Sequence, residues 1–168
     1  TYSDIEYHIF INYIRLNYEI YILGNDYKSA EKILSDNLGR LSNKELLYLL
    51  FFQSIIYSYD IAKNNFISYS DNLNSEMQLE NTIWNHLSEM FIEKLTPLEL
   101  IEKVSSDHDN TNRIENICIA NCFIGIKYML EGSSTVATQY FSNSFATEKV
   151  DLLEYNIAKN QLENTVNM

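Results

Sequence analysis

The chain has 168 residues, 46% of them hydrophobic, and a formal net charge of −11 at pH 7. This length predicts one domain, residues 1–168, that can bury a core without disulfides or metal ions, and the hydrophobic content excludes a disordered chain. Only 4 glycines and 1 proline occur, so the residues that most β-turns require are scarce and an all-α fold is expected.

Polar breaks separate segments in which apolar residues recur every three or four positions, as in amphipathic helices. Ile5, Ile9, Tyr13, Leu16 and Ile20 form such a series in the first segment. Long and short segments alternate, which is typical of stacked antiparallel helical hairpins. In chain order, the pattern predicts about nine helices, at residues 3–23, 26–38, 43–58, 60–67, 76–93, 97–104, 113–131, 134–146 and 150–164.

Helix starts are indicated by capping boxes, in which a Ser, Thr, Asp or Asn precedes a Glu or Gln by three residues. Thr96 with Glu99 is the best defined of these, because Pro97 follows at the first helical position, where its missing N–H costs nothing. The other pairs are Ser3 with Glu6, Ser42 with Glu45, Ser75 with Gln78, Asn112 with Glu115, and Asp151 with Glu154.

Motifs of catalysis are missing from the sequence: it has no glycine-rich phosphate loop, no G-x-S-x-G and no H-E-x-x-H. Cys118 and Cys122 are interpreted as small apolar residues on one helix face. Asp107, His108 and Asp109 are adjacent in a polar loop, and adjacent side chains rarely converge on one ion. We therefore expect no catalytic residue, no cofactor and no metal site.

Acidic residues are concentrated in residues 71–115, where ten acids stand against three bases, a net charge of −7. Such a segment repels nucleic acid and anionic lipid and attracts a basic protein surface. The alternative is a solvated face that only keeps the protein in solution, with Glu76–Glu80 and Glu89–Glu93 as i,i+4 pairs on one helix. The residues expected to bind a protein partner are Glu76, Glu80, Glu89, Glu93, Glu99, Glu102, Asp107 and Asp109.

The longest unbroken apolar run is Leu46–Phe52, much shorter than the roughly 20 residues of a membrane span. The first residues, TYSDIEYHIF, are acidic where a secretory signal is basic. These features predict no membrane span and a cytoplasmic location. A periplasmic location is the alternative if a leader has been removed.

The stretch GIKYMLEGSSTVATQYF, residues 125–141, resembles a tetratricopeptide repeat, a helical hairpin of about 34 residues. A second, partial copy is NDYKSAEKIL, residues 25–34, in which Tyr27, Ala30 and Leu34 take corresponding places. The resemblance implies that small residues lie where the two helices of a hairpin meet. In the first copy it places Ile124 and Gly125 at that contact, Tyr128 one turn on, Gly132 at the turn, and Ala137 and Phe141 on the second helix.

Two longer stretches, WNHLSEMFIEKLTPLELIEKV and NCFIGIKYMLEGSSTVATQYFSNSFATEKVDLLEYNIAKNQL, look like the C-terminal half of the NlpI-like tetratricopeptide lipoproteins of the bacterial envelope. Members of that family are scaffolds that bring proteases and cell-wall hydrolases together and have no active site. The resemblance therefore implies an α-solenoid of TPR-like hairpins and an adaptor function.

In such repeats the first helix of each hairpin lines a concave surface. The last hairpin is apolar on this face, so either the closing helix around Leu153 to Leu162 or a partner must cover it, and we favour the closing helix. The residues expected on this face are Asn12, Arg15, Glu19 and Ile22 in the first hairpin, and Ile119, Cys122, Ile126 and Met129 in the last.

Two classes of function follow, a non-catalytic protein-binding module and, less well supported, an enzyme without a recognisable motif. Within the first class we favour an acidic immunity protein that binds and neutralises a cognate bacterial toxin. A nuclease toxin needs a basic cleft for phosphates, which an acidic face would complement. The alternative is an NlpI-like adaptor that binds envelope proteases or cell-wall hydrolases through Asn12, Arg15 and Glu19.

Overall fold

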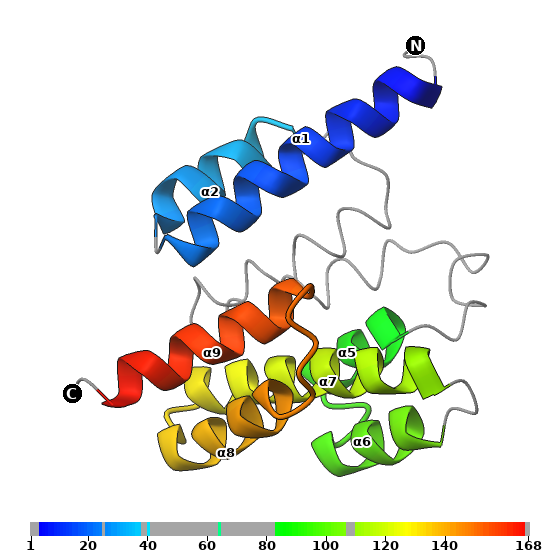
Figure 1. The fold of residues 1–168 in the computed structure, drawn as a ribbon, viewed down its shortest axis with the longest axis vertical. Coiled ribbons are helices and arrows are strands. Elements are labelled where there is room, and N and C mark those ends of the chain that lie inside the picture. The colour runs from blue at the N-terminus through cyan, green and yellow to red at the C-terminus, as the bar shows by residue number, and fades with distance from the viewer. Residues whose placement is uncertain are drawn as a thin grey trace. The chain divides into compact units, whose positions relative to one another are not determined.

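The computed structural model describes residues 4–24, 26–37, 40, 64, 83–106 and 110–166. Within these residues it has helices and no strand, so the all-α expectation is confirmed for this part of the chain. The helices, labelled in Figure 1, are α1 (Asp4–Leu23), α2 (Tyr27–Ser35), α5 (Ile83–Phe91), α6 (Pro97–Ser105), α7 (Asn110–Leu130), α8 (Ser134–Phe145) and α9 (Leu153–Val166).

The predicted helices at 43–58 and 60–67 lie outside the described residues, except for Asn64, whose backbone is helical. The total of about nine helices and the solenoid arrangement therefore stay predictions. The chain divides into two compact units, residues 1–56 and 57–168. The expectation of a single domain, which came from length, also stays a prediction.

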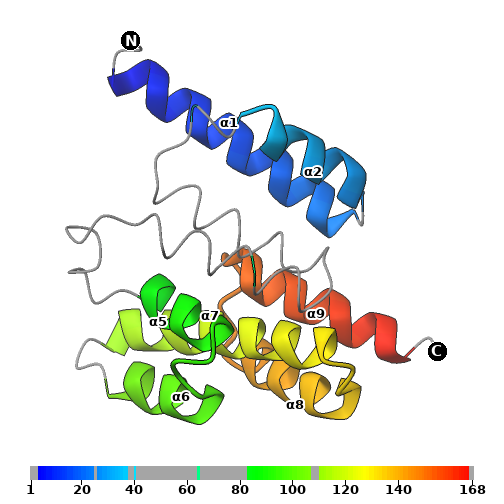
Figure 2. The ribbon, with the colours of Figure 1, turned by 180° about the vertical axis from the view of Figure 1, so that it is seen from behind.

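In the first unit, α1 and α2 pack side by side as a hairpin (Figures 1 and 2). Ile14, Tyr18 and Ile22 form the buried side of α1, at helical spacing. Ala30 of α2 is fully buried, and its small side chain suits a close approach of two helices. Asp26 caps the start of α2 by accepting a hydrogen bond from the Ser29 N–H at 3.2 Å, and hydrogen bonding to Ser29 lowers the Asp26 pKa.

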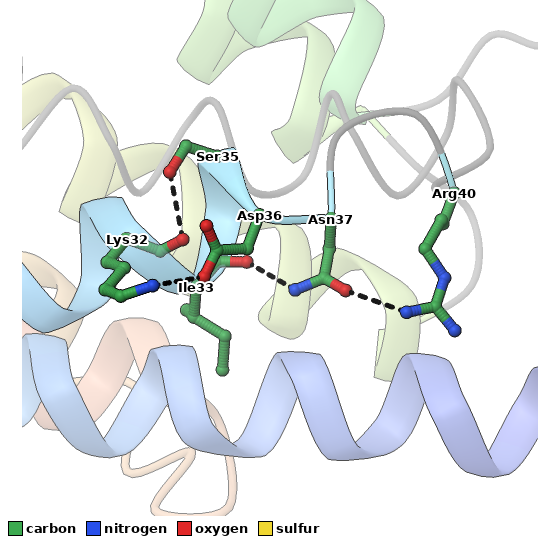
Figure 3. Close-up of polar contacts among 6 residues, drawn as sticks. All are labelled: Lys32, Ile33, Ser35, Asp36, Asn37 and Arg40. Carbon is green, nitrogen blue, oxygen red and sulfur yellow. Dashed lines mark hydrogen bonds and ion pairs between the residues drawn. The ribbon is translucent and has the colours of Figure 1, made fainter.

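The end of α2 is held by side chains (Figure 3). The amide Nδ2 of Asn37 donates to the carbonyl of Ile33 at 2.8 Å, one of the last carbonyls of the helix, which have no partner within it. Arg40 Nη1 donates to Asn37 Oδ1 at 3.4 Å. The Arg40 guanidinium also lies over the Phe10 ring, 4.1 Å from its centroid, a cation–π contact. These contacts tie the residues after α2 back to α1.

The second unit is built around α7, which contacts α5, α6, α8 and α9. Every residue from Cys118 to Lys127 is buried, so the middle of this helix is enclosed on all sides, as expected for a helix that is apolar around most of its circumference. The neighbouring helices supply the rest of the core, with Leu87, Met90, Phe91, Leu100, Val104, Ala137, Phe141, Leu153, Ile157 and Ala158.

Gly125 determines how closely α7 and α8 pack. A Cβ atom at this position would lie 2.7 Å from two ring carbons of Phe141. One turn further on, the rings of Tyr128 and Tyr140 stack with their centroids 5.6 Å apart, and Gly132 makes the turn with φ of 79°. The predicted close approach at Gly125 is therefore confirmed, whereas membership of the repeat family stays a prediction.

Two of the predicted helix starts are wrong. Since α7 begins at Asn110, Asn112 lies inside the helix and cannot be its N-cap. The last helix begins at Leu153, three residues later than expected. Before it, Glu148 has φ of 57°, and the Leu152 N–H donates to the Lys149 carbonyl at 2.9 Å in a turn that occupies residues 150–152.

The capping box at Thr96 is confirmed. The hydroxyl Oγ1 of Thr96 accepts from the Glu99 N–H at 3.2 Å, and the Glu99 carboxylate accepts from the Thr96 N–H at 2.8 Å. Hydrogen bonding to Thr96 lowers the pKa of Glu99. The stabilisation from this carboxylate is therefore complete above its unfolded-state pKa and is lost as the pH falls through the lower folded-state pKa.

Replacing Thr96 by alanine is expected to lower the free energy of unfolding by about 1 kcal/mol, because the first turn of α6 loses its side-chain acceptor. Urea denaturation at neutral pH measures this loss. Ser133→Ala is the matched control, since Ser133 is the N-cap of α8 but its side chain makes no capping hydrogen bond; its effect should stay within about 0.5 kcal/mol. Equal losses in the two variants would contradict the role given to Thr96.

Candidate functional site

A second apolar series lies on the exposed side of α1. This side of the helix carries four large apolar residues that are more than half exposed: Ile9 (65%), Tyr13 (61%), Leu16 (57%) and Ile20 (56%). Their spacing of four, three and four residues places them in one line along the helix. We call these four residues the outer face of α1. Because single exposed apolar residues are normal but a continuous line of them is not, this face is a candidate contact surface.

Polar side chains flank the outer face. Arg15 Nε donates to Glu19 Oε1 at 2.9 Å in an i,i+4 ion pair, and Asn17 Nδ2 donates to the Tyr13 carbonyl at 2.7 Å. Asn12 is exposed on the same helix. An apolar centre with a polar rim is the usual composition of a protein–protein interface, in which Tyr and Arg are enriched among the residues that dominate binding.

The sequence-predicted concave face is only partly exposed in the first unit. Asn12 and Arg15 are exposed and Glu19 is half-buried, but Ile22 is only 4% exposed and belongs to the buried side of α1. Its assignment to an open concave face is therefore wrong. The pattern failed here because α1 has apolar residues on two sides, and only packing decides which side is covered.

In the second unit, α9 packs against α7 and α8. Ile119, Cys122 and Ile126 are buried, and Met129 is half-buried. On α9, Leu153, Ile157 and Ala158 are buried in turn, and burial, together with the negative charge of Glu154, raises the pKa of the Cys122 thiol. The apolar face of α7 is thus covered within the described chain, and α9, the closing helix that the sequence favoured, is one of the helices that contact α7.

Half of the acidic residues predicted to bind a partner fall in the described part of the chain. Glu89 lies on α5, Glu93 follows that helix, and Glu99 and Glu102 lie on α6; all are exposed. The others, Glu76, Glu80, Asp107 and Asp109, lie outside the described residues. Residues 83–106 contain these four acids and two lysines, so this part of the segment carries only a small share of its negative charge.

The local environments of these carboxylates differ. Glu99 is engaged in the capping box with Thr96, and a carboxylate oxygen of Glu89 lies 3.4 Å from Nδ1 of His86. The expected Glu89–Glu93 pair on one helix is wrong, because α5 ends at Phe91 and Glu93 has φ of 63°. The N–H groups of residues 94 and 95 both donate to the Glu89 carbonyl and close the helix there.

Both cysteines are buried and free, which confirms their interpretation as small apolar core residues. Burial raises the pKa of the Cys118 thiol and raises that of Cys122 further, so neither forms the reactive thiolate readily. The Ser144 hydroxyl donates to the Cys118 carbonyl at 2.9 Å. This hydrogen bond joins α7 to α8.

No group of three or more His, Cys, Asp or Glu side chains in the described residues is arranged to hold a metal ion. The Asp107-His108-Asp109 loop lies outside them. Among the described helices, none combines the length and the apolar character needed to cross a membrane.

The chain matches no family model, no curated protein and no solved structure. Its resemblance to tetratricopeptide repeats and to NlpI-like lipoproteins therefore stays a prediction from the residues quoted above. Functional inference rests on the two surfaces just described, the outer face of α1 and the exposed carboxylates around α5 and α6.

Proposed function

We propose that this chain is a non-catalytic protein-binding module. The outer face of α1 is the observation that supports this most directly, because a continuous exposed line of large apolar side chains is typical of interaction sites. Tyr13 lies within the line and Arg15 beside it, and these residue types give large contact areas and charge-assisted hydrogen bonds. The helix also keeps its other apolar side for the hairpin with α2, so binding need not open the fold.

The finer form of the proposal is an acidic immunity protein that binds and neutralises a cognate bacterial toxin. The net charge of −11 supports it, as does the exposure of Glu89, Glu93 and Glu102. A basic nuclease surface would be drawn to these carboxylates from a distance, which raises the rate of association. Glu99 contributes charge as well, but its carboxylate is engaged with Thr96.

The second candidate is an NlpI-like adaptor that brings an envelope protease or a cell-wall hydrolase to its place of action. Its support is the exposure of Asn12 and Arg15 on α1, where the resemblance places the concave surface of the first repeat. In this form the polar rim and the outer face of α1 contact the enzyme together.

Charge reversal separates the two forms. The triple variant Glu89→Lys, Glu93→Lys and Glu102→Lys is expected to weaken capture of a basic protein from native lysate by tenfold or more, and the difference should shrink at high salt. Glu99 is left unchanged so that α6 keeps its cap. Arg15→Glu is the matched control, since it changes the charge of an exposed residue on α1 instead.

The captured protein is identified by mass spectrometry, and circular dichroism confirms that each variant is folded. Loss of capture with Arg15→Glu but not with the triple variant would support the adaptor in place of the inhibitor. Capture that depends neither on these charges nor on the outer face of α1 would refute the binding module as proposed.

A further inference from the structure

The outer face of α1 has the spacing to pair with a copy of itself. Ile9, Tyr13, Leu16 and Ile20 follow one another at four, three and four residues, an order that is the same from either end of the helix. Alternating intervals of four and three are those of a coiled-coil seam. An antiparallel second α1 would therefore set Ile9 opposite the partner's Ile20, and Tyr13 opposite the partner's Leu16.

A separate side of α1 makes the hairpin with α2. Ile14, Tyr18 and Ile22 are at most 4% exposed, whereas all four residues of the outer face are more than half exposed. Since residues four apart on a helix share a side, the two series run along the helix as distinct lines. Pairing through the outer face would leave the hairpin intact.

The area suits a weak, reversible pair. At the observed exposures the four residues present roughly 500 Å² on one helix, so a symmetric pair that covered them completely would bury about 1,000 Å², the lower limit for a specific interface. An isologous two-fold contact of this kind is also the commonest arrangement among soluble oligomers.

The charges beside the outer face favour the antiparallel order. Glu19 is already paired with Arg15 of its own helix at 2.9 Å. Antiparallel packing places Glu19 near the partner's Asn12, whose amide can donate to the carboxylate, and keeps the two Glu19 side chains at opposite ends of the contact. No like charges face each other across the seam.

We infer that a second copy of this chain docks antiparallel on the outer face of α1 and forms a two-fold symmetric dimer. The inference rests on the proposed function, because that function is supported by the outer face of α1 and the inference names a second copy of the chain as the partner that binds there. Such a dimer presents two sets of acidic residues, so a partner with two basic sites would be bound more tightly by avidity.

Light scattering coupled to size-exclusion chromatography tests the dimer on the full chain. At about 100 μM the unmodified chain is expected to elute at twice its mass of 19.7 kDa. Leu16→Glu, which puts a carboxylate in the seam, is expected to elute at the single mass. Lys28→Gln, which changes the charge equally at an exposed residue of α2, should remain dimeric. An unmodified chain of single mass at every concentration would overturn the inference, as would a dimeric L16E variant.

Cross-linking tests the orientation without a destabilising charge. Chains carrying I9C are mixed with chains carrying I20C and a size tag, and the mixture is exposed to oxidised glutathione. The antiparallel dimer is expected to give disulfides between the two kinds of chain, and Cys118 and Cys122 are buried and should stay unlinked. Disulfides only between chains of one kind, I9C to I9C or I20C to I20C, would show a parallel pair and reject the inferred arrangement.

Failure of the dimer and failure of the proposed function give different results. If the unmodified chain is monomeric and L16E abolishes capture of another protein, the outer face binds that protein and only the dimer is rejected. If the chain is monomeric and neither L16E nor the triple charge-reversal variant of Glu89, Glu93 and Glu102 changes capture, both are rejected.

Discussion

Replacing Gly125 by alanine is expected to lower the free energy of unfolding by about 1–2 kcal/mol, because the added methyl group overfills the contact between α7 and α8. Its carbon would lie 2.7 Å from Cδ1 and Cε1 of Phe141 and 3.1 Å from Cζ. Phe141 is itself in the core, so the ring has no open space to enter and the helices must separate. Urea denaturation followed by circular dichroism measures the change.

The sign of this effect is informative. Alanine stabilises a helix interior by about 1 kcal/mol relative to glycine, so without the steric conflict the variant would be more stable than the original chain. A Gly125→Ala chain that gained stability would therefore refute the close packing described for α7 and α8.

Two further variants isolate the cause. In a Phe141→Leu background, Gly125→Ala should cost less than it does alone, because the side chain it meets is smaller, and a double-mutant cycle gives the coupling. Gly132→Ala is the control for backbone strain. Gly132 has φ of 79° with open space around it, so alanine there should cost about 1 kcal/mol from conformation alone.

Truncation of Phe123 to alanine is expected to have the largest effect on stability, a loss of about 3–5 kcal/mol. The ring is fully buried in the middle of α7, where removal leaves a cavity enclosed on all sides. It also packs edge-to-face with Trp84, with the ring centroids 6.1 Å apart. Since Trp84 is the only tryptophan of the chain, its fluorescence should change in the folded variant and follow unfolding in urea.

Phe145→Ala is the matched control for this truncation. Phe145 is exposed, and its ring stacks on Tyr155 with the centroids 5.1 Å apart, so its removal should cost only about 1 kcal/mol and leave the Trp84 emission unchanged. Comparable losses for the two phenylalanines would contradict the position of Phe123 at the centre of the second unit.

Much of the fold could be predicted from local chemistry. The start of α6 follows from Thr96, Pro97 and Glu99, because each satisfies a requirement of the first helical turn that depends on no other part of the chain. Gly125 was assigned to a helix contact through the resemblance to a tetratricopeptide repeat, and the structure supplies the steric reason, because a Cβ atom there would lie 2.7 Å from ring carbons of Phe141. The signal at α6 is specific because its cause lies within a few residues.

The capping-box pattern alone was less reliable. Asn112 and Asp151 each precede a Glu by three residues, yet one lies inside α7 and the other in the turn before α9. Two residues at this spacing also occur inside helices and turns, and the actual boundary depends on where the packed helices can reverse direction. At Glu93 and Glu148 the chain turns through backbone conformations that glycine usually supplies, so composition gave no signal.

The candidate site was harder to predict than the fold. Both apolar series of α1 are visible in the sequence. The second series is the signal that could have indicated a contact surface, since a helix in an ordinary hairpin needs only one apolar side. Which series is covered depends on α2, whose position no local pattern specifies. The result is that Ile22 was assigned to a surface and Ile9, Tyr13, Leu16 and Ile20 were not.

The enclosure of α7 by other helices affects how the second unit unfolds and which of its residues can vary. Because α5, α6, α8 and α9 all pack on the same helix, detaching any one of them would bare apolar surface that the other three cannot cover. The second unit should therefore lose its structure in one cooperative step instead of helix by helix. Substitutions between Cys118 and Lys127 fall on buried residues of the shared helix, whereas the solvent sides of the outer helices can vary independently. New binding specificity can thus arise on those outer sides while the shared central helix keeps the architecture constant.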